Sequence, residues 1–250
     1  IEAEGLECLE RIARTLSDDV WVCAPAVEQS GKGRGITLTE PLRVLNLGEK
    51  RFAVTGTPTD CVIMGVRSIL LDKKPDLVLS GVNRGGNLAE DVMYSGTVGG
   101  AMEAALQGLP AVALSQYFGP EIFGLDDPFE SARAHGAAVI RRLLDHADWA
   151  PDADFRLFYN VNFPPLPAAR TGDIRVAAQG RRQGAGFGVE PFVAPNGRRF
   201  LWVRGSAQDV DATPGSDVMV NLEGDISVTP MRADLTCHAS LDGLRKALGS

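Results

Sequence analysis

Three polar, glycine-containing segments carry the groups in this sequence that could do chemistry. The first, Ser80-Gly81-Val82-Asn83-Arg84-Gly85-Gly86-Asn87, follows a short apolar run and offers amide oxygens and nitrogens. The second, Tyr94-Ser95-Gly96-Thr97-Val98, opens an Ala-rich stretch, and the third, Glu28-Gln29-Ser30-Gly31-Lys32, follows Ala24-Pro25. Together they supply neutral oxygen ligands and N–H donors rather than thiolates or imidazoles. This set favours a hard cation such as Mg²⁺ or Mn²⁺, bound together with a phosphate.

Each segment taken alone also has an ordinary structural explanation. The first fits a tight loop with asparagine at positive φ, the second fits helix N-capping by a hydroxyl, and the third fits a solvated loop. The second segment is equally suited to an anion, because hydroxyls, backbone N–H groups and the positive end of a helix dipole meet there. Negative charge is what the set lacks. The carboxylates near it in sequence, none of which a pattern assigns to a metal, are Glu28, Asp60, Glu90 and Asp91.

Alternating strands and helices are expected to position these segments. Short, continuously apolar runs at 20–23, 77–79 and 111–114 are typical of parallel strands buried on both faces, and a further strand is expected at 157–162. Helices are predicted at 4–16, from 57 to about 70, at 97–107 and at 131–146, and a loop at 80–91. The alternation predicts a three-layer, Rossmann-like α/β fold with a mostly parallel sheet. Ligands bind beyond the carboxyl ends of the strands in such sheets, which is where the three polar segments fall.

The last third of the chain follows a different pattern. Asn196-Gly197 between two apolar runs predicts a β-hairpin. A hairpin does not bury both of its faces alone, so Phe192, Phe200 and Trp202 are expected to pack on the core or on another subunit. We therefore divide the chain into a Rossmann-like core at 1–165, an extended hairpin arm at 166–214, and a returning strand with a C-terminal helix at 215–250.

Composition narrows the classes of function. The net charge of −7 argues against a protein that binds nucleic-acid polymers, which usually carries a basic face. No apolar run reaches the roughly 18 residues of a membrane span, and no signal-peptide pattern is present. None of the four cysteines forms a C-x-x-C pair, which suits free thiols in a reducing cytoplasm. A dinucleotide-dependent oxidoreductase is disfavoured because G-x-G-x-x-G does not follow the first strand.

Several spaced motifs resemble those of the SurE family of metal-dependent nucleotide phosphatases. Beyond the polar segments at 80–87 and 94–98, the matching elements are Ala24-Pro25 with Gln29-Ser30-Gly31, Gly56-Thr57-Pro58-Thr59-Asp60-Cys61, Asn162-Phe163-Pro164 and Ser227-Val228-Thr229-Pro230. They occur in the family's order over almost the whole chain.

The resemblance implies hydrolysis of nucleoside 5′- and 3′-monophosphates by a 5′-nucleotidase with some action on short polyphosphate. It also implies one divalent ion, Mg²⁺ or Mn²⁺, per subunit, with Ser30 and Asn83 as metal ligands. The phosphate-binding residues expected from it are Asn83, Arg84, Gly85, Asn87, Ser95, Gly96 and Thr97. Through the arm and the final helix it implies a homodimer or homotetramer.

The family also holds its metal with two adjacent aspartates on a first strand. Their expected place is immediately before Ile1, so no catalytic residue is assigned within this sequence. If that aspartate pair is absent from the protein, the alternative is a non-catalytic protein that binds nucleotides or phosphate.

Overall fold

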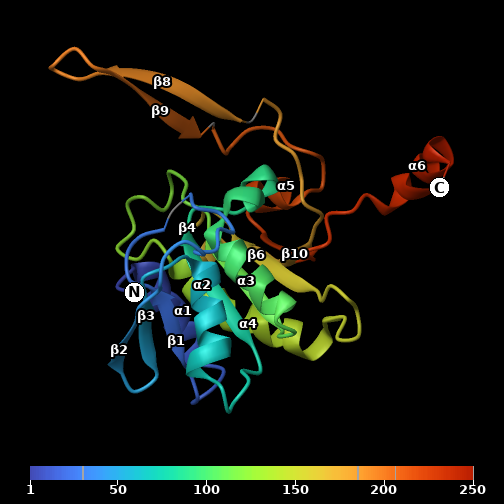
Figure 1. Cartoon of the computed structure of the whole chain (residues 1–250). Coiled ribbons are helices and arrows are strands. Elements are labelled where there is room, and N and C mark those ends of the chain that lie inside the picture. The colour runs from blue at the N-terminus through green and yellow to red at the C-terminus, as the bar shows by residue number, and fades with distance from the viewer. Residues whose placement is uncertain (30, 185, 206, 250) are drawn as a thin grey trace.

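Two β-sheets with helices packed on them form the body of the protein, and a β-hairpin projects from it (Figure 1). The computed structural model describes residues 1–29, 31–184, 186–205 and 207–249. The α-helices are α1 (Glu4–Arg14), α2 (Pro58–Met64), α3 (Gly96–Leu106), α4 (Glu130–His146), α5 (Asp217–Leu222) and α6 (Leu241–Leu248). Shorter helical turns are η1 (Gly65–Ile69), η2 (Ala89–Tyr94), η3 (Ala168–Arg170) and η4 (His238–Ser240). The strands are β1 (Val22–Pro25), β2 (Val44–Gly48), β3 (Arg51–Val54), β4 (Val78–Arg84), β5 (Ala111–Gln116), β6 (Phe158–Phe163), β7 (Ile174–Val176), β8 (Phe187–Val193), β9 (Arg199–Gly205) and β10 (Ile226–Met231).

The larger sheet has the strand order β4-β5-β6-β10-β7, and its first three strands run parallel. Successive side chains of β5 enter different layers. Val112 and Leu114 join a core with α1 and α4, whereas Ala111 and Ala113 join a core with α3. Helices therefore cover both faces of the sheet, which confirms the predicted three-layer α/β fold. In the described part of the chain, no helix has the length and apolar character of a membrane span.

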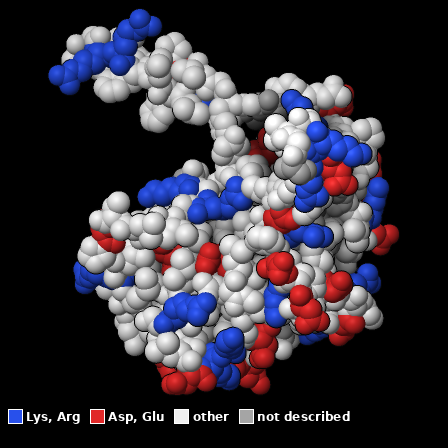
Figure 2. Space-filling model, turned by 45° about the vertical axis from the view of Figure 1, so that its right-hand side comes forward, with Lys and Arg blue, Asp and Glu red and all other residues white. Residues whose placement is uncertain are grey.

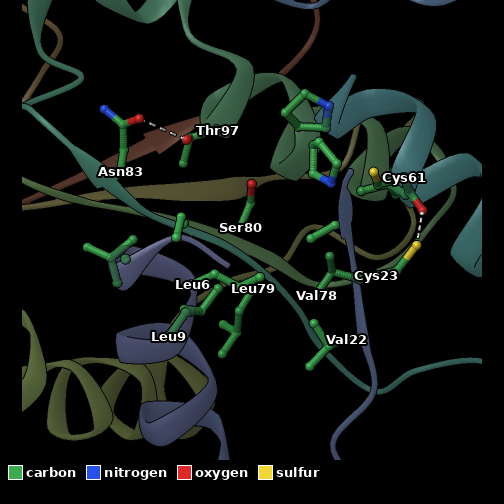
Figure 3. Close-up of a pocket in the computed structure, with 18 of the residues that line it drawn as sticks. Leu6, Leu9, Val22, Cys23, Cys61, Val78, Leu79, Ser80, Asn83 and Thr97 are labelled. Atoms are coloured by element: carbon green, nitrogen blue, oxygen red, sulfur yellow. Dashed lines mark hydrogen bonds between the residues drawn. The ribbon is translucent and has the colours of Figure 1, made fainter. Parts of the chain in front are cut away.

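A second, three-stranded sheet has the order β1-β3-β2 and is separate from the first. Within the described residues β1 pairs with β3 and β4 pairs with β5, so one edge of β1 and one edge of β4 stay unpaired. Between them lies a cavity of about 1240 Å³, whose lining includes Val22, Leu79 and Leu9 (Figure 3). The terminal ammonium of Ile1 donates to the carbonyl of Pro25 at the carboxyl end of β1 (2.8 Å). We call the apolar part of this cavity, between the two strand edges, the slot.

Strand β4 continues beyond the apolar run that predicted it. The loop predicted at 80–91 is wrong for residues 80–84, because pairing with β5 resumes at Asn83 after a register shift. Gly81 permits this path: its φ is +140°, and a Cβ there would lie 2.3 Å from the carbonyl oxygen of Leu114. The Gly/Asn composition that indicated a loop therefore belongs to an irregular strand that carries Asn83 to its carboxyl end.

The segment predicted as an arm, 166–214, is only partly an arm. Its strand β7 pairs in parallel with β10 inside the larger sheet, and Arg182 is buried against the body. The projecting part is the hairpin β8–β9. The final segment, 215–250, also contains the unpredicted helix α5, whose residues Val218 and Val220 are buried.

The hairpin itself forms where the sequence predicts it. Its turn spans residues 194–198, with the N–H of Gly197 donating to the carbonyl of Ala194 (2.9 Å) and a φ of +79° at Gly197. Every residue of β8 and β9 is exposed. Figure 2 shows the hairpin standing clear of the body, with basic side chains at its free end. Such an exposed apolar ribbon is typical of a surface that another chain covers.

Candidate active site

The carboxyl end of β4 meets the first turn of α3 at one end of the cavity (Figure 3). Asn83 projects from β4, and the hydroxyl of Thr97 on α3 donates to its Oδ1 at 3.4 Å. The amide nitrogen of Asn83 donates to the carbonyl of Gly85 (2.9 Å). That second bond orients the amide, so Oδ1 faces the helix. Asn83 and Thr97, predicted from separate segments, are thus brought together.

The N-terminus of α3 places hydrogen-bond donors at the cavity. Ser95 is its N-cap, and the Ser95 hydroxyl oxygen accepts from the N–H of Val98 (3.1 Å). The N–H groups of Gly96 and Thr97 lie in the first turn, where an α-helix has no internal acceptor for them. These donors line the cavity together with the positive end of the helix dipole. The Ser95 hydroxyl oxygen therefore serves as the helix cap, and the N–H groups of Gly96 and Thr97 are the donors left for an anion.

Arg84 and Gly85 flank Asn83 with different surroundings. The guanidinium of Arg84 lies over the ring of Phe118, 4.9 Å from its centroid, and the residue is exposed. Gly85 has a φ of +111°, and its N–H donates to the carbonyl of Gln116 (2.8 Å). Both residues line the cavity. Arg84 is the cation nearest in sequence to Asn83, but in this structure it rests on an aromatic ring.

Asn87 has a different environment from the rest of its segment. It is 5% exposed, its N–H donates to Oδ1 of Asn162 (2.8 Å), and its side-chain amide donates to the hydroxyl of Ser115 (2.7 Å). Its carbonyl accepts from the amide of Asn160 (2.8 Å). These bonds give Asn87 an anchoring role, fixing the loop after β4 to β5 and β6. Its direct contact with phosphate stays a prediction.

Ser30, the other predicted metal ligand, lies outside the described residues. Its neighbours Gln29 and Gly31 line the cavity, which brings the third polar segment to the same place as the first two.

The Asp60 carboxylate takes part in the N-terminal cap of α2. Its carboxylate accepts from the N–H of Thr57 (2.9 Å) and from the N–H and hydroxyl of Thr37 (3.0 and 2.7 Å), while Thr57 caps α2 in return. Burial alone would raise the pKa of Asp60, but these hydrogen bonds outweigh it and hold the pKa below its ordinary value. Asp60 is thereby satisfied as a structural group and is not available to a metal.

Glu90 and Asp91 are engaged by a buried arginine that the sequence did not reveal. Arg182 is 4% exposed, and its guanidinium lies 3.2 Å from a carboxylate oxygen of Glu90 and 2.8 Å from one of Asp91. The amide of Gln208 donates to the same Asp91 oxygen (3.2 Å). Burial raises the pKa of Asp91 above its ordinary value, although Arg182 acts in the opposite direction. Arg182 stands in a Gly/Arg-rich stretch whose local pattern resembles a solvated loop, so no sequence signal marked its burial.

The described residues fit a divalent cation only in part. Asn83 offers one neutral amide oxygen at the cavity, and no cluster of three or more His, Cys, Asp or Glu side chains within the described ranges is placed to hold a metal. Mg²⁺ and Mn²⁺ sites normally include carboxylates. Glu28 and Asp91, two of the carboxylates near the polar segments in sequence, also line the cavity, and Asp91 is paired there with Arg182.

Comparison with known proteins gives a consistent result. Residues 1–185 match the family model described as survival protein SurE. A 5′-nucleotidase SurE from Cereibacter sphaeroides is 58% identical over 252 residues, covering 100% of this chain and 96% of that protein. The corresponding protein from Ruegeria pomeroyi is 53% identical, with 99% and 96% coverage. The crystal structure of the SurE protein from Aquifex aeolicus superposes with a TM-score of 0.81 at 35% identity, covering 99% of this chain and 95% of that one.

The capping role of Asp60 predicts a pH-dependent loss of stability in the variant Asp60→Asn. The lowered pKa means that the carboxylate stabilises the fold above the unfolded-state pKa of about 3.9, and that this contribution is lost as pH falls through the folded-state pKa. Urea unfolding should show Asp60→Asn well below wild type at pH 7 and closer to it near pH 3. The exposed Asp72→Asn is the control. An equal deficit at both pH values would contradict the assignment.

Proposed function

Because this chain belongs to the SurE family, we propose that it is a metal-dependent phosphomonoesterase that hydrolyses nucleoside 5′- and 3′-monophosphates to nucleoside and phosphate. Short polyphosphate is a further substrate in this proposal. The observation that supports it best is the meeting of β4 and α3, where the hydroxyl of Thr97 lies 3.4 Å from Oδ1 of Asn83. An oxygen suited to a hard cation and donors suited to a phosphate face one cavity there.

The proposal assigns one Mg²⁺ or Mn²⁺ ion to each subunit, held in part by Asn83 and Ser30. Such an ion, when bound, polarises the phosphate and lowers the pKa of a coordinated water. The N–H groups of Gly96 and Thr97 and the Thr97 hydroxyl would bind the phosphoryl oxygens. Fixed donors of this kind stabilise the negative charge that develops on those oxygens during hydrolysis.

We further propose that an extended segment preceding Ile1 fills the slot as a strand and carries the aspartate pair. Two observations support this: the facing edges of β1 and β4 are unpaired within the described residues, and the walls between them are apolar. Buried strand edges without partners are costly, so a pairing strand is the favourable occupant. A strand parallel to β1 would bring its last residues to the end of the sheet where Asn83 lies.

The proposal includes a homodimer or homotetramer in the cytoplasm, without nucleic-acid polymer or membrane partners. The apolar side chains of β8 and β9 are exposed, including Phe192 (48%), Phe200 (51%) and Trp202 (57%). Helix α6 likewise has no buried residue, and it lies away from the body in Figure 1. Both elements would gain stability by burying these side chains on a second copy of the chain.

Metal dependence is the first test. The full-length protein should release phosphate from AMP and GMP with Mn²⁺ or Mg²⁺ and stop doing so in excess EDTA, because polarisation of the phosphate needs the ion. Activity should return when metal is restored. Full turnover in excess EDTA would contradict the metal-dependent mechanism.

Substitution of the two facing side chains should separate their roles. Asn83→Ala and Thr97→Ala should each reduce kcat/KM for AMP by about 10²–10³, the usual effect of removing one electrostatic partner. Asn83→Ala should also raise the Mn²⁺ concentration needed for half-maximal activity, whereas Thr97→Ala should leave it unchanged. Matched controls are the exposed Asn46→Ala and Thr39→Ala. Wild-type kinetics in both site variants would show that the site is misplaced.

Removal of the hairpin tests its role in assembly. Deletion of residues 187–205 should convert the oligomer to monomers in light scattering, because the exposed apolar ribbon would no longer join subunits. A triple variant with Phe192, Phe200 and Trp202 each changed to Ser keeps the chain length and should have the same effect. An oligomer of unchanged mass in both proteins would refute the proposed role.

A further inference from the structure

A half-exposed tyrosine ring stands directly beside the candidate phosphate site. Tyr94 is the last residue of η2, immediately before the N-cap Ser95, and its side chain lines the same cavity as Gly96 and Thr97. The residue is 51% exposed. Phosphate is recognised by N–H groups and cations and has no use for an aromatic face. The ring is therefore available to a part of the ligand other than the phosphate.

The tyrosine ring is held by the first residue of the hairpin, and the helical turn that carries it is anchored separately. The ring of Phe187, the first residue of β8, packs against it edge to face, with centroids 5.0 Å apart and planes at 88°. Arg182 donates to the carbonyl of Leu88, just before η2 (3.3 Å), and to the carboxylate of Asp91 within it (2.8 Å), which anchors η2. An aromatic ring fixed in this way loses little conformational freedom when a flat ligand covers it.

Polar atoms accompany the ring at the cavity wall. The carboxylate of Asp91 and the amide of Gln208 both line the cavity, and they are bonded to each other at 3.2 Å. The Asp91 carboxylate is also paired with Arg182 (2.8 Å), so these polar groups already have partners within the protein. The open feature of this part of the lining is therefore the half-exposed Tyr94 ring, which suits a flat heterocyclic base better than it suits inorganic phosphate.

We propose that Tyr94 is the platform on which the nucleobase of the substrate stacks, held in place by Phe187 and by the Arg182 anchor. The inference rests on the proposed function and adds to it how a nucleoside is told from other phosphate esters. Because every base has a π face, stacking of this kind binds purine and pyrimidine nucleotides with little preference for one base over another. A sugar phosphate without a base would bind through its phosphate and hydroxyls alone.

The experiment compares AMP with ribose 5-phosphate, which has the same phosphate and sugar but no base. Hydrolysis of both by the full-length protein with Mn²⁺ is measured for wild type, Tyr94→Ala, Tyr94→Leu and Tyr94→Phe. Binding of both compounds is measured in parallel by calorimetry, so the result does not depend on turnover. Phe123→Ala is the matched control, since Phe123 is an exposed aromatic residue outside the cavity lining.

Wild type should favour AMP over ribose 5-phosphate by roughly 5- to 100-fold in kcat/KM, the range expected for one base–aromatic stack. Tyr94→Ala and Tyr94→Leu should abolish that preference by raising KM and Kd for AMP alone. Tyr94→Phe and the control should keep it. Tyr94→Leu preserves apolar volume, so a folding defect in Tyr94→Ala would not hide the answer.

Two outcomes would overturn the platform while leaving the proposed function intact: equal wild-type kcat/KM for both compounds, or equal losses for both in the leucine variant. The latter would mean that Tyr94 only shapes the phosphate loop. Conversely, AMP binding that is selective and dependent on Tyr94, without hydrolysis in any metal, would uphold the platform and contradict the proposed phosphatase.

Discussion

Small residues along one side of α3 let that helix lie close to β4, and this contact sets the spacing of the candidate site. A Cβ on Gly100 would lie 2.9 Å from the hydroxyl of Ser80, and one on Gly96 would lie 3.1 Å from the ring of Pro58. A larger residue at either position would push α3 away from its neighbours. Thr97 would then move away from Asn83, and the donors of the helix N-terminus would no longer share one cavity with the strand end.

Buried polar side chains hold the loop after β4 and the turn η2 in place. Asn87 donates to both Asn162 and Ser115 beneath the loop after β4, and these bonds anchor the backbone of that loop. Asp217 is fully buried and accepts from the N–H groups of Ala89 and Gly180 (3.0 and 2.8 Å). It therefore links η2 to the segment that leads into the hairpin. Burial raises the pKa of Asp217, and these bonds partly offset that effect. The same buried carboxylate therefore helps to position both the candidate site and the segment before the hairpin.

In the proposed function, the slot accounts for why the described residues supply only part of a metal site. Two sheets that would form one continuous sheet with a single added strand are kept apart by a cavity with apolar walls. In the proposed function the same strand completes the sheet and brings carboxylates to the end where Asn83 lies. Structural completion and metal binding would then have one cause, since the ligands are positioned by the strand that joins the two sheets.

Elements with local causes could be predicted from the amino-acid sequence alone. Continuous apolar runs marked β1, β5 and the start of β4, the Thr57 and Asp60 pair marked the cap of α2, and Asn196-Gly197 marked the hairpin. The spaced motifs also identified the family.

Other features depend on partners that are distant in the chain, and only the folded structure reveals them. Strand β4 runs on to Arg84 because β5 supplies its ladder, and Asn87 anchors a loop because Ser115 and Asn162 lie beneath it. Arg182 is buried because Glu90 and Asp91, more than ninety positions earlier, neutralise its charge. No local pattern encodes such pairings, because burial of a polar group is favourable only when the rest of the fold brings its partner.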